Sequence, residues 1–70
     1  MKGAWGMSEM LMKLIIKTEV TLVTKKTRKE FKVFVSDIWE DGRIFVGWYT
    51  NRFGELAIKH FDMTQYDYYL

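Results

Sequence analysis

The chain contains no cysteine, no proline and a single histidine, His60. Without cysteine it can form neither a disulfide nor a thiolate zinc site, so any metal site would have to rest on carboxylates. Apolar runs such as Leu14-Ile15-Ile16 are far shorter than the roughly 20 residues that a membrane-spanning helix needs. The N-terminus also lacks the apolar stretch and the small-residue cleavage site of a signal peptide. We therefore expect a cytoplasmic protein that does not enter a membrane.

Large apolar side chains are abundant, since the 70 residues include three Trp, five Phe, four Tyr and five Met. A domain this small buries only about 60% of the surface that its unfolded chain exposes, so it depends on such side chains for a core. Charge is spread unevenly. Residues 1–32 carry eight Lys/Arg against three Glu, whereas residues 33–70 carry three Lys/Arg against six Asp/Glu. Either the basic half faces a polyanion, or both halves are ordinary solvated surface.

A β-hairpin is the clearest prediction for the middle of the chain. Two β-type runs, residues 31–39 and 43–50, flank Glu40-Asp41-Gly42, and Asp-Gly favours a tight turn because such turns need positive φ. Apolar alternation slips near Ser36-Asp37, which indicates a bulge or a bend. Gly47 in mid-strand indicates a sharp bend or the close approach of another backbone.

Elements before and after this hairpin are predicted from alternation. A strand is expected over residues 12–24, with a helix over Ser8–Lys17, capped by Ser8, as the competing interpretation. Another strand is expected over residues 55–61, with Leu56 and Ile58 facing the core. Asp62 and Gln65 have the spacing of a capping box, which predicts one helical turn over residues 63–68.

These elements predict an all-β fold: a small curled antiparallel sheet, or an SH3-like barrel, of four to five strands with a short C-terminal helical turn. Residues 1–11 are expected to be a flexible N-terminal leader, and residues 12–70 the single β-barrel domain. The run from Ile44 to Tyr49, the Gly54 turn and the charged strand after it loosely resemble the small archaeal chromatin proteins of SH3-like fold. That resemblance covers residues 30–70 and supports the fold more than the activity, because those proteins are far more basic on the sheet that faces DNA.

Catalytic motifs are missing from the sequence, so we expect a non-enzymatic protein without a cofactor. His60 lies in a predicted strand and shares parity with Leu56 and Ile58, which indicates a half-buried structural residue. The acids of the central hairpin end, Asp37, Glu40 and Asp41, are interpreted as a polar turn rather than a cation site. A chain of this length has little room for a ligand-sized cleft, so no small-molecule substrate is expected.

Protein–protein interaction is the first functional hypothesis, of the adaptor or inhibitor type found in viruses and mobile elements. Aromatic residues make up 17% of the chain, more than a small core is expected to hide, and surplus Trp and Tyr are typical of interfaces. Trp48 is assigned to the core, where its replacement by alanine would unfold the domain. The expected interface residues, facing a protein partner or a second copy, are Trp39, Phe53, Tyr66, Tyr68 and Tyr69.

Nucleic-acid binding is the alternative hypothesis. A compact cationic turn joins the first two predicted strands, and cations that neutralise phosphates bind nucleic acid without sequence preference. Lysine-rich hairpin ends also protect β proteins from aggregation, so the pattern fits both interpretations. The residues expected to contact nucleic acid are Lys25, Lys26, Arg28, Lys29 and Lys32.

Overall fold

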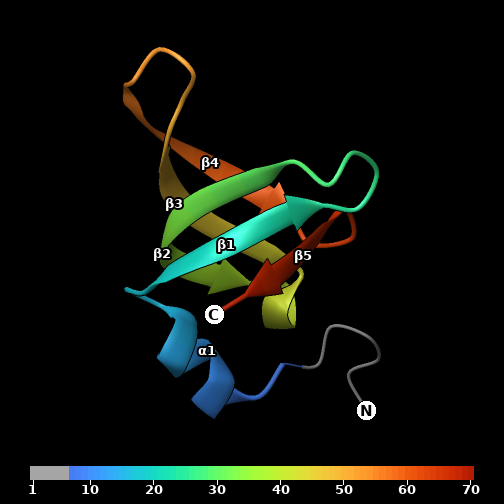
Figure 1. The fold of residues 1–70 in the computed structure, drawn as a ribbon. Helices are drawn as coiled ribbons and strands as arrows, with labels where there is room; N and C mark the ends of the chain where they lie inside the picture. Colours follow the sequence, from blue (N-terminus) through green and yellow to red (C-terminus); the bar gives the residue numbers. More distant parts are fainter. Residues whose placement is uncertain (1–6) are drawn as a thin grey trace.

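The computed structural model describes residues 7–70, which form one antiparallel sheet of five strands, a helix and a short 3-10 turn (Figure 1). The elements are α1 (Glu9–Ile15), β1 (Glu19–Thr24), β2 (Glu30–Trp39), the 3-10 turn (Glu40–Gly42), β3 (Ile44–Thr50), β4 (Leu56–Asp62) and β5 (Tyr66–Tyr69). The strand order is β4-β3-β2-β1-β5, so β1 to β4 form a meander and β5 returns to the free side of β1. The predicted β class is confirmed.

The sheet is strongly curled but not closed. Its two edge strands, β4 and β5, are joined by residues 63–65 alone. A link of that length spans at most about 14 Å, whereas the edges of a flat five-stranded sheet lie about 19 Å apart. The sheet must therefore bend until its edges approach, and the rings of Phe61 in β4 and Tyr66 in β5 meet with centroids 5.4 Å apart. β4 and β5 contact through side chains and are not neighbours in the strand order.

The central hairpin is confirmed. β2 and β3 pair antiparallel, with Ile38 opposite Phe45 and Trp39 opposite Ile44. Positive φ values occur at Glu40 (54°), Asp41 (56°) and Gly42 (102°), as the Asp-Gly prediction requires. The connection is longer than a two-residue turn, because it passes through the 3-10 turn before β3 begins.

Both irregularities predicted in this hairpin are present. The pairing of β2 with β3 shifts register between Val35 and Asp37, which confirms the bulge. Gly47 lies against β2 so closely that a Cβ atom there would be 2.5 Å from Val33 Cγ1 and 2.6 Å from the Phe34 carbonyl oxygen. The glycine therefore marks a close backbone approach inside the sheet.

The strand predicted over residues 12–24 is wrong in its first half, where the competing helix is correct. α1 begins after Ser8, whose Oγ accepts a hydrogen bond from the Leu11 N–H at 3.1 Å. Leu11 and Ile15 are one helical turn apart and pack toward the core, while Leu14 is exposed. Helical spacing and a serine cap outweigh the short alternation of this segment.

Only part of the expected leader, residues 7–11, is described by the structure, and that part belongs to the fold. Residues 1–6, including Trp5, lie outside the described residues. From Met7 onward the segment is part of the fold: the Met7 N–H donates to the Asp41 carbonyl at 3.0 Å, and its side chain lies against Gly42. α1 follows directly, at the end of the molecule where the C-terminus also lies (Figure 1).

The inward face predicted for β4 is wrong. Pairing with β3 places Phe61 opposite the buried Phe45, so Phe61 is the residue of β4 that enters the core. Leu56 and Ile58 have the opposite parity and are exposed, and His60, expected to be half-buried, is exposed with them. The apolar alternation predicted the wrong face because the core-facing positions before Phe61 are Ala57 and Lys59, one small and the other charged, whereas the large apolar residues occupy the outward positions.

The C-terminal helical turn is also wrong. Asp62 Oδ1 accepts from the Thr64 N–H at 3.0 Å, as a cap would, but the Gln65 N–H returns to the Asp62 carbonyl at 2.9 Å and closes a turn. The chain then enters β5, in which Tyr68 pairs with Leu22 of β1. An Asp side chain that caps a helix can equally close a turn, and the free side of β1 selects the strand.

The core lies on the concave side of the curled sheet, closed at one end by α1. Tyr66 and Tyr68 pack against its rim, with the Tyr68 and Phe45 rings 5.4 Å apart. Trp48 is 42% exposed, so its assignment to the core is wrong. The wholly buried large side chains are Ile15, Val20, Leu22, Val33, Val35, Phe45 and Phe61.

Candidate functional site

A row of three exposed apolar side chains crosses the convex side of β2, β3 and β4. The register places Phe34 directly opposite Trp48, and Trp48 directly opposite Ile58. Directly opposed residues of antiparallel strands project from the same face, with Cβ atoms about 4.5–5.5 Å apart. Their exposed fractions are 46%, 42% and 52%, which are high for side chains of this size in a folded domain.

A second aromatic position extends this row along the sheet. Trp39, at the end of β2, is half-exposed, and its ring centroid lies 4.9 Å from that of His60 on β4. The Trp39 Nε1–H donates to Asp37 Oδ2 at 2.8 Å, which fixes the indole against the sheet. A rigid, half-exposed Trp with its polar atom already satisfied loses little entropy on binding. We call the set of Phe34, Trp39, Trp48, Leu56, Ile58 and His60 the outer face.

The outer face leaves a sizeable apolar area in contact with water. A Trp or Phe side chain presents about 150–250 Å², so at the exposed fractions above the central row alone leaves a few hundred Å² of apolar surface in water. Patches of about 300–600 Å² on small monomers are often functional. Phe34 lies on the same side of β2 as the polar residues Glu30 and Lys32. An aromatic residue on the polar side of a strand is the feature of the sequence that points to this row.

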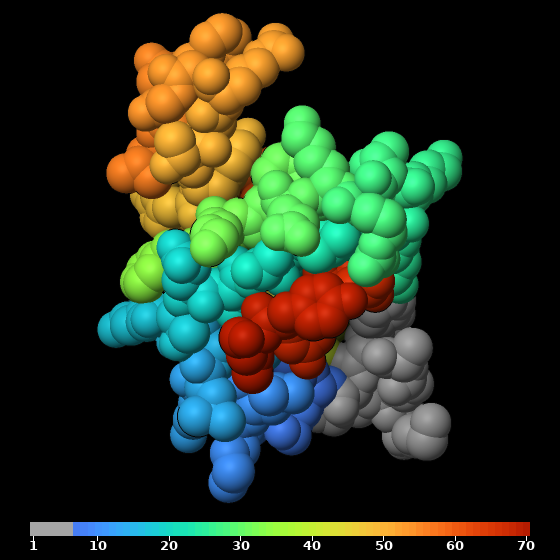
Figure 2. Space-filling view, in the orientation of Figure 1, coloured from blue at the N-terminus to red at the C-terminus, as the bar shows by residue number. Residues whose placement is uncertain are grey.

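The interface residues expected from the sequence do not come together. Trp39 belongs to the outer face. Phe53 is 73% exposed at the tip of the β3–β4 hairpin, the orange segment that projects from the body in Figure 2. Tyr66 and Tyr68 pack on the rim of the core, while Tyr69 is half-exposed on β5 opposite Thr21.

The cationic turn between β1 and β2 is partly neutralised. Arg28 donates to Asp67 Oδ2 at 3.0 Å. The pKa of its guanidinium is raised above its usual range, mainly by a hydrogen bond with Tyr69 and next by the one with Asp67. The Lys29 ammonium lies 5.6 Å from the Phe31 ring centroid, and Lys32 lies on β2 opposite Thr21. Lys25 and Lys26 are exposed, and within residues 7–70 they take part in no ion pair. These two lysines are therefore the available cations of the turn.

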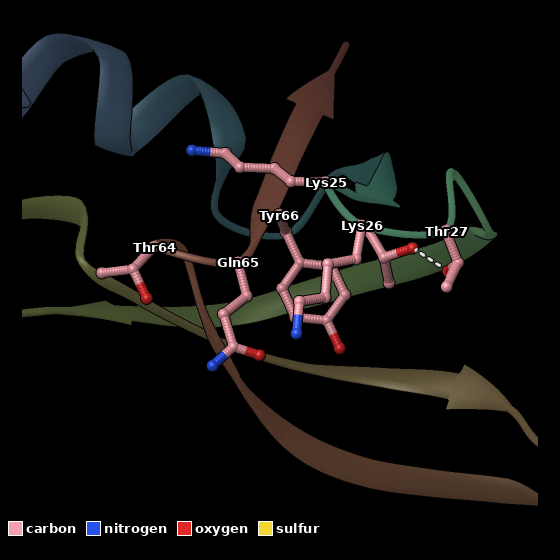
Figure 3. Close-up of a pocket in the computed structure, with 7 residues that line it drawn as sticks. Lys25, Lys26, Thr27, Thr64, Gln65 and Tyr66 are labelled. Carbon is pink, nitrogen blue, oxygen red and sulfur yellow. Dashed lines mark hydrogen bonds between the residues drawn. The ribbon is translucent and has the colours of Figure 1, made fainter.

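A pocket of about 450 Å³ lies between this turn and the turn that joins β4 to β5 (Figure 3). Its lining comes from residues 24–27 on one side and 64–66 on the other. The two turns are joined by a backbone hydrogen bond from the Lys25 N–H to the Gln65 carbonyl at 2.9 Å. A chain of this length was expected to have little room for a cleft. The structure nevertheless forms this pocket, because two segments far apart in the sequence line it together.

The acids of the central hairpin are used within the fold. Asp37 accepts from the Ile38 N–H and from Trp39, and Glu40 pairs with Arg43 at 3.0 Å. In the part of the chain that the structure describes, no three acidic or histidine side chains are grouped to hold a metal ion. Hydrogen bonds from the Thr64 backbone N–H and then its hydroxyl hold the pKa of Asp62 below its usual range.

Neither α1 nor any other helix within residues 7–70 has the length and apolarity to cross a membrane. Comparison of the chain with protein-family models, with curated protein sequences and with solved structures found no match in any of the three.

Proposed function

We propose that this chain is a small, non-enzymatic binding module that docks a partner protein on its outer face. The row of Phe34, Trp48 and Ile58 across three strands carries the proposal, because each side chain is about half-exposed on a rigid sheet. Interfaces gain most of their free energy from such large side chains at their centre, surrounded by polar groups that exclude water. The aromatic surplus of the sequence supports the same function.

The charges beside the row favour a particular kind of partner. Glu19 of β1 lies opposite Phe34 in the register, and Asp37 lies opposite Val46 in the next row. A segment with alternating aliphatic and cationic side chains matches this surface, since its apolar residues cover the row. Its cations meet the two carboxylates and the indole faces. The occupant we propose is such a segment of another protein.

We also infer that the sheet is an open relative of the SH3-like barrels. Five strands, strong curl and contact of the edge strands through Phe61 and Tyr66 support this inference. In such a fold the β2–β3–β4 sheet is held rigid by the core beneath it. Rigidity matters for the proposed function because a preorganised surface binds at a lower entropic cost.

The proposal predicts that single substitutions on the outer face strongly weaken peptide binding without unfolding the protein. Displayed random peptides would be selected on the wild-type protein, and affinities would then be measured by anisotropy. Trp48→Ala is expected to weaken the selected peptides about 30-fold, the loss typical of an interface hot spot. Its melting temperature should fall less than that of a core variant such as Phe61→Ala, since Trp48 is 42% exposed and Phe61 is wholly buried.

A matched pair of phenylalanines provides the control. Phe34→Ser removes an outer-face ring, whereas Phe53→Ser removes the same kind of side chain, which is more exposed, from the tip of the β3–β4 hairpin. Peptides that lose affinity for the first variant and keep it for the second support the proposal. Selected peptides that bind both variants as tightly as the wild type would refute it. A dimer that only Phe34→Ser dissociates would make a second copy the occupant.

Nucleic acid is the second candidate ligand, favoured by the exposed Lys25 and Lys26, which make no ion pair within residues 7–70. If it binds, anisotropy of labelled duplex and single-stranded DNA should show an affinity that falls steeply between two salt concentrations, since several counterions are released. Lys25→Glu combined with Lys26→Glu should abolish that binding. No binding at low salt would eliminate this candidate.

A further inference from the structure

The pocket between the two turns has the chemistry of an anion site. Its lining includes two lysines, Lys25 and Lys26, and contains no acidic residue. Lys26, Gln65 and Tyr66 come from both sides of the pocket, and their ammonium, amide and phenol groups form no hydrogen bond with any residue from 7 to 70. Figure 3 shows the Lys26 side chain extending alongside the Tyr66 ring, with Gln65 next to them.

We propose that this pocket binds a phosphate ester of mononucleotide size. Lys26 would hold the phosphate as a point charge, and the Gln65 amide and the Tyr66 hydroxyl would donate to its oxygens. Lys25, whose side chain extends toward α1 in Figure 3, adds positive potential without closing on the same point. The proposal goes beyond the proposed function, because the pocket shares no residue with the outer face.

The size of the pocket distinguishes an ester from a bare anion. A volume of about 450 Å³ lies within the range that small-molecule ligands occupy, and it exceeds what inorganic phosphate needs. The remaining lining is suited to an organic group, since it consists of threonine methyl groups, lysine stems and the Tyr66 ring. The hydrogen bond of 2.6 Å between the Thr24 and Thr27 hydroxyls holds one wall in place.

Two acids near the pocket would oppose an anion, and both are already engaged. Asp67, next to Tyr66, binds Arg28 at 3.0 Å. Asp62 accepts from both the N–H and the hydroxyl of Thr64, so that hydroxyl has its proton directed away from a ligand. The donors left for the phosphate are therefore those of Lys26, Gln65 and Tyr66, with Lys25 nearby.

The test is a titration of the ¹⁵N-labelled protein with AMP, followed by amide chemical shifts. AMP is expected to shift residues 24–27 and 64–66 at concentrations up to about 10 mM, at which even a weak site fills. Adenosine, which lacks the phosphate, should leave them unchanged. Lys26→Gln should weaken AMP about tenfold, the loss expected for one charge-assisted contact. Lys13→Gln removes the same charge from α1, which contributes no residue to the lining of the pocket, and should bind as the wild type does.

A second arm distinguishes the source of the phosphate. A short oligothymidylate with a 5′-phosphate is compared with the same strand lacking it. A phosphorylated strand that binds more tightly than both AMP and the unphosphorylated strand would assign the pocket to a nucleic-acid end, and tighter binding of AMP would assign it to a free nucleotide; both support a phosphate-ester site. Equal binding of the two strands, both tighter than AMP, would mean that backbone phosphates bind Lys25 and Lys26 without an ester in the pocket, and would overturn the proposal. Absence of shifts with either ligand, equal shifts with inorganic phosphate alone, or full affinity in Lys26→Gln would overturn the proposal.

Discussion

Phe61→Ala is expected to remove a large part of the stability of the domain and to lower its unfolding midpoints accordingly. Phe61 is wholly buried at the edge of the sheet, and its ring meets those of Phe31, Tyr49 and Tyr66. Truncating a core Phe costs about 3–5 kcal/mol, while a 70-residue domain is stable by only about 4–10 kcal/mol. The loss also removes the contact between β4 and β5 that holds the two edges of the curled sheet together. Circular dichroism during thermal and urea unfolding would measure the effect.

Phe53→Ala is the matched control, because it removes the same side chain from the exposed hairpin tip. Its free energy of unfolding should change by less than about 0.5 kcal/mol, as for surface substitutions in general. Equal stability losses in the two variants would contradict the placement of Phe61 in the core. They would also call for a different register between β3 and β4.

Gly47→Ala is expected to be the second most damaging change. The added Cβ would lie 2.5 Å from Val33 Cγ1 and 2.6 Å from the Phe34 carbonyl oxygen, a separation that real Cβ atoms do not show. Because one of these atoms belongs to the backbone of the paired strand, β2 and β3 must move apart or change register. Overpacking of this kind costs about 1–3 kcal/mol, and we expect the upper end of that range from urea unfolding.

Gly54→Ala separates this steric effect from the loss of glycine itself. Gly54 has a φ of 79° in the tip of the β3–β4 hairpin, and nothing lies within 4 Å of an added Cβ. The substitution should cost about 1 kcal/mol through backbone strain alone. If Gly47→Ala proves no worse than Gly54→Ala, the close approach of β2 to β3 is not rigid. The outer-face row built on those strands would then be less preorganised than we propose.

The central hairpin was predictable because its signals are local. The Asp41-Gly42 turn, the slip at Ser36-Asp37 and the mid-strand Gly47 each act within a few residues, so the sequence alone indicates the turn, the bulge and the close approach. Ser8 likewise marks the start of α1, although alternation beyond it favoured a strand. The errors lie where local signals were ambiguous, as at Asp62, which can cap a helix or close a turn.

The β class, the position of the central hairpin and the abundance of aromatic side chains follow from the order of the residues alone. The buried face of each strand does not, because it depends on a register set by partners far away in the chain. Pairing with Phe45 buries Phe61 and turns Ile58 outward beside Trp48 and Phe34, so the outer face exists only once three strands are aligned. The pocket has the same origin: the curl of the sheet brings Lys26 and Tyr66 together from turns about 40 residues apart.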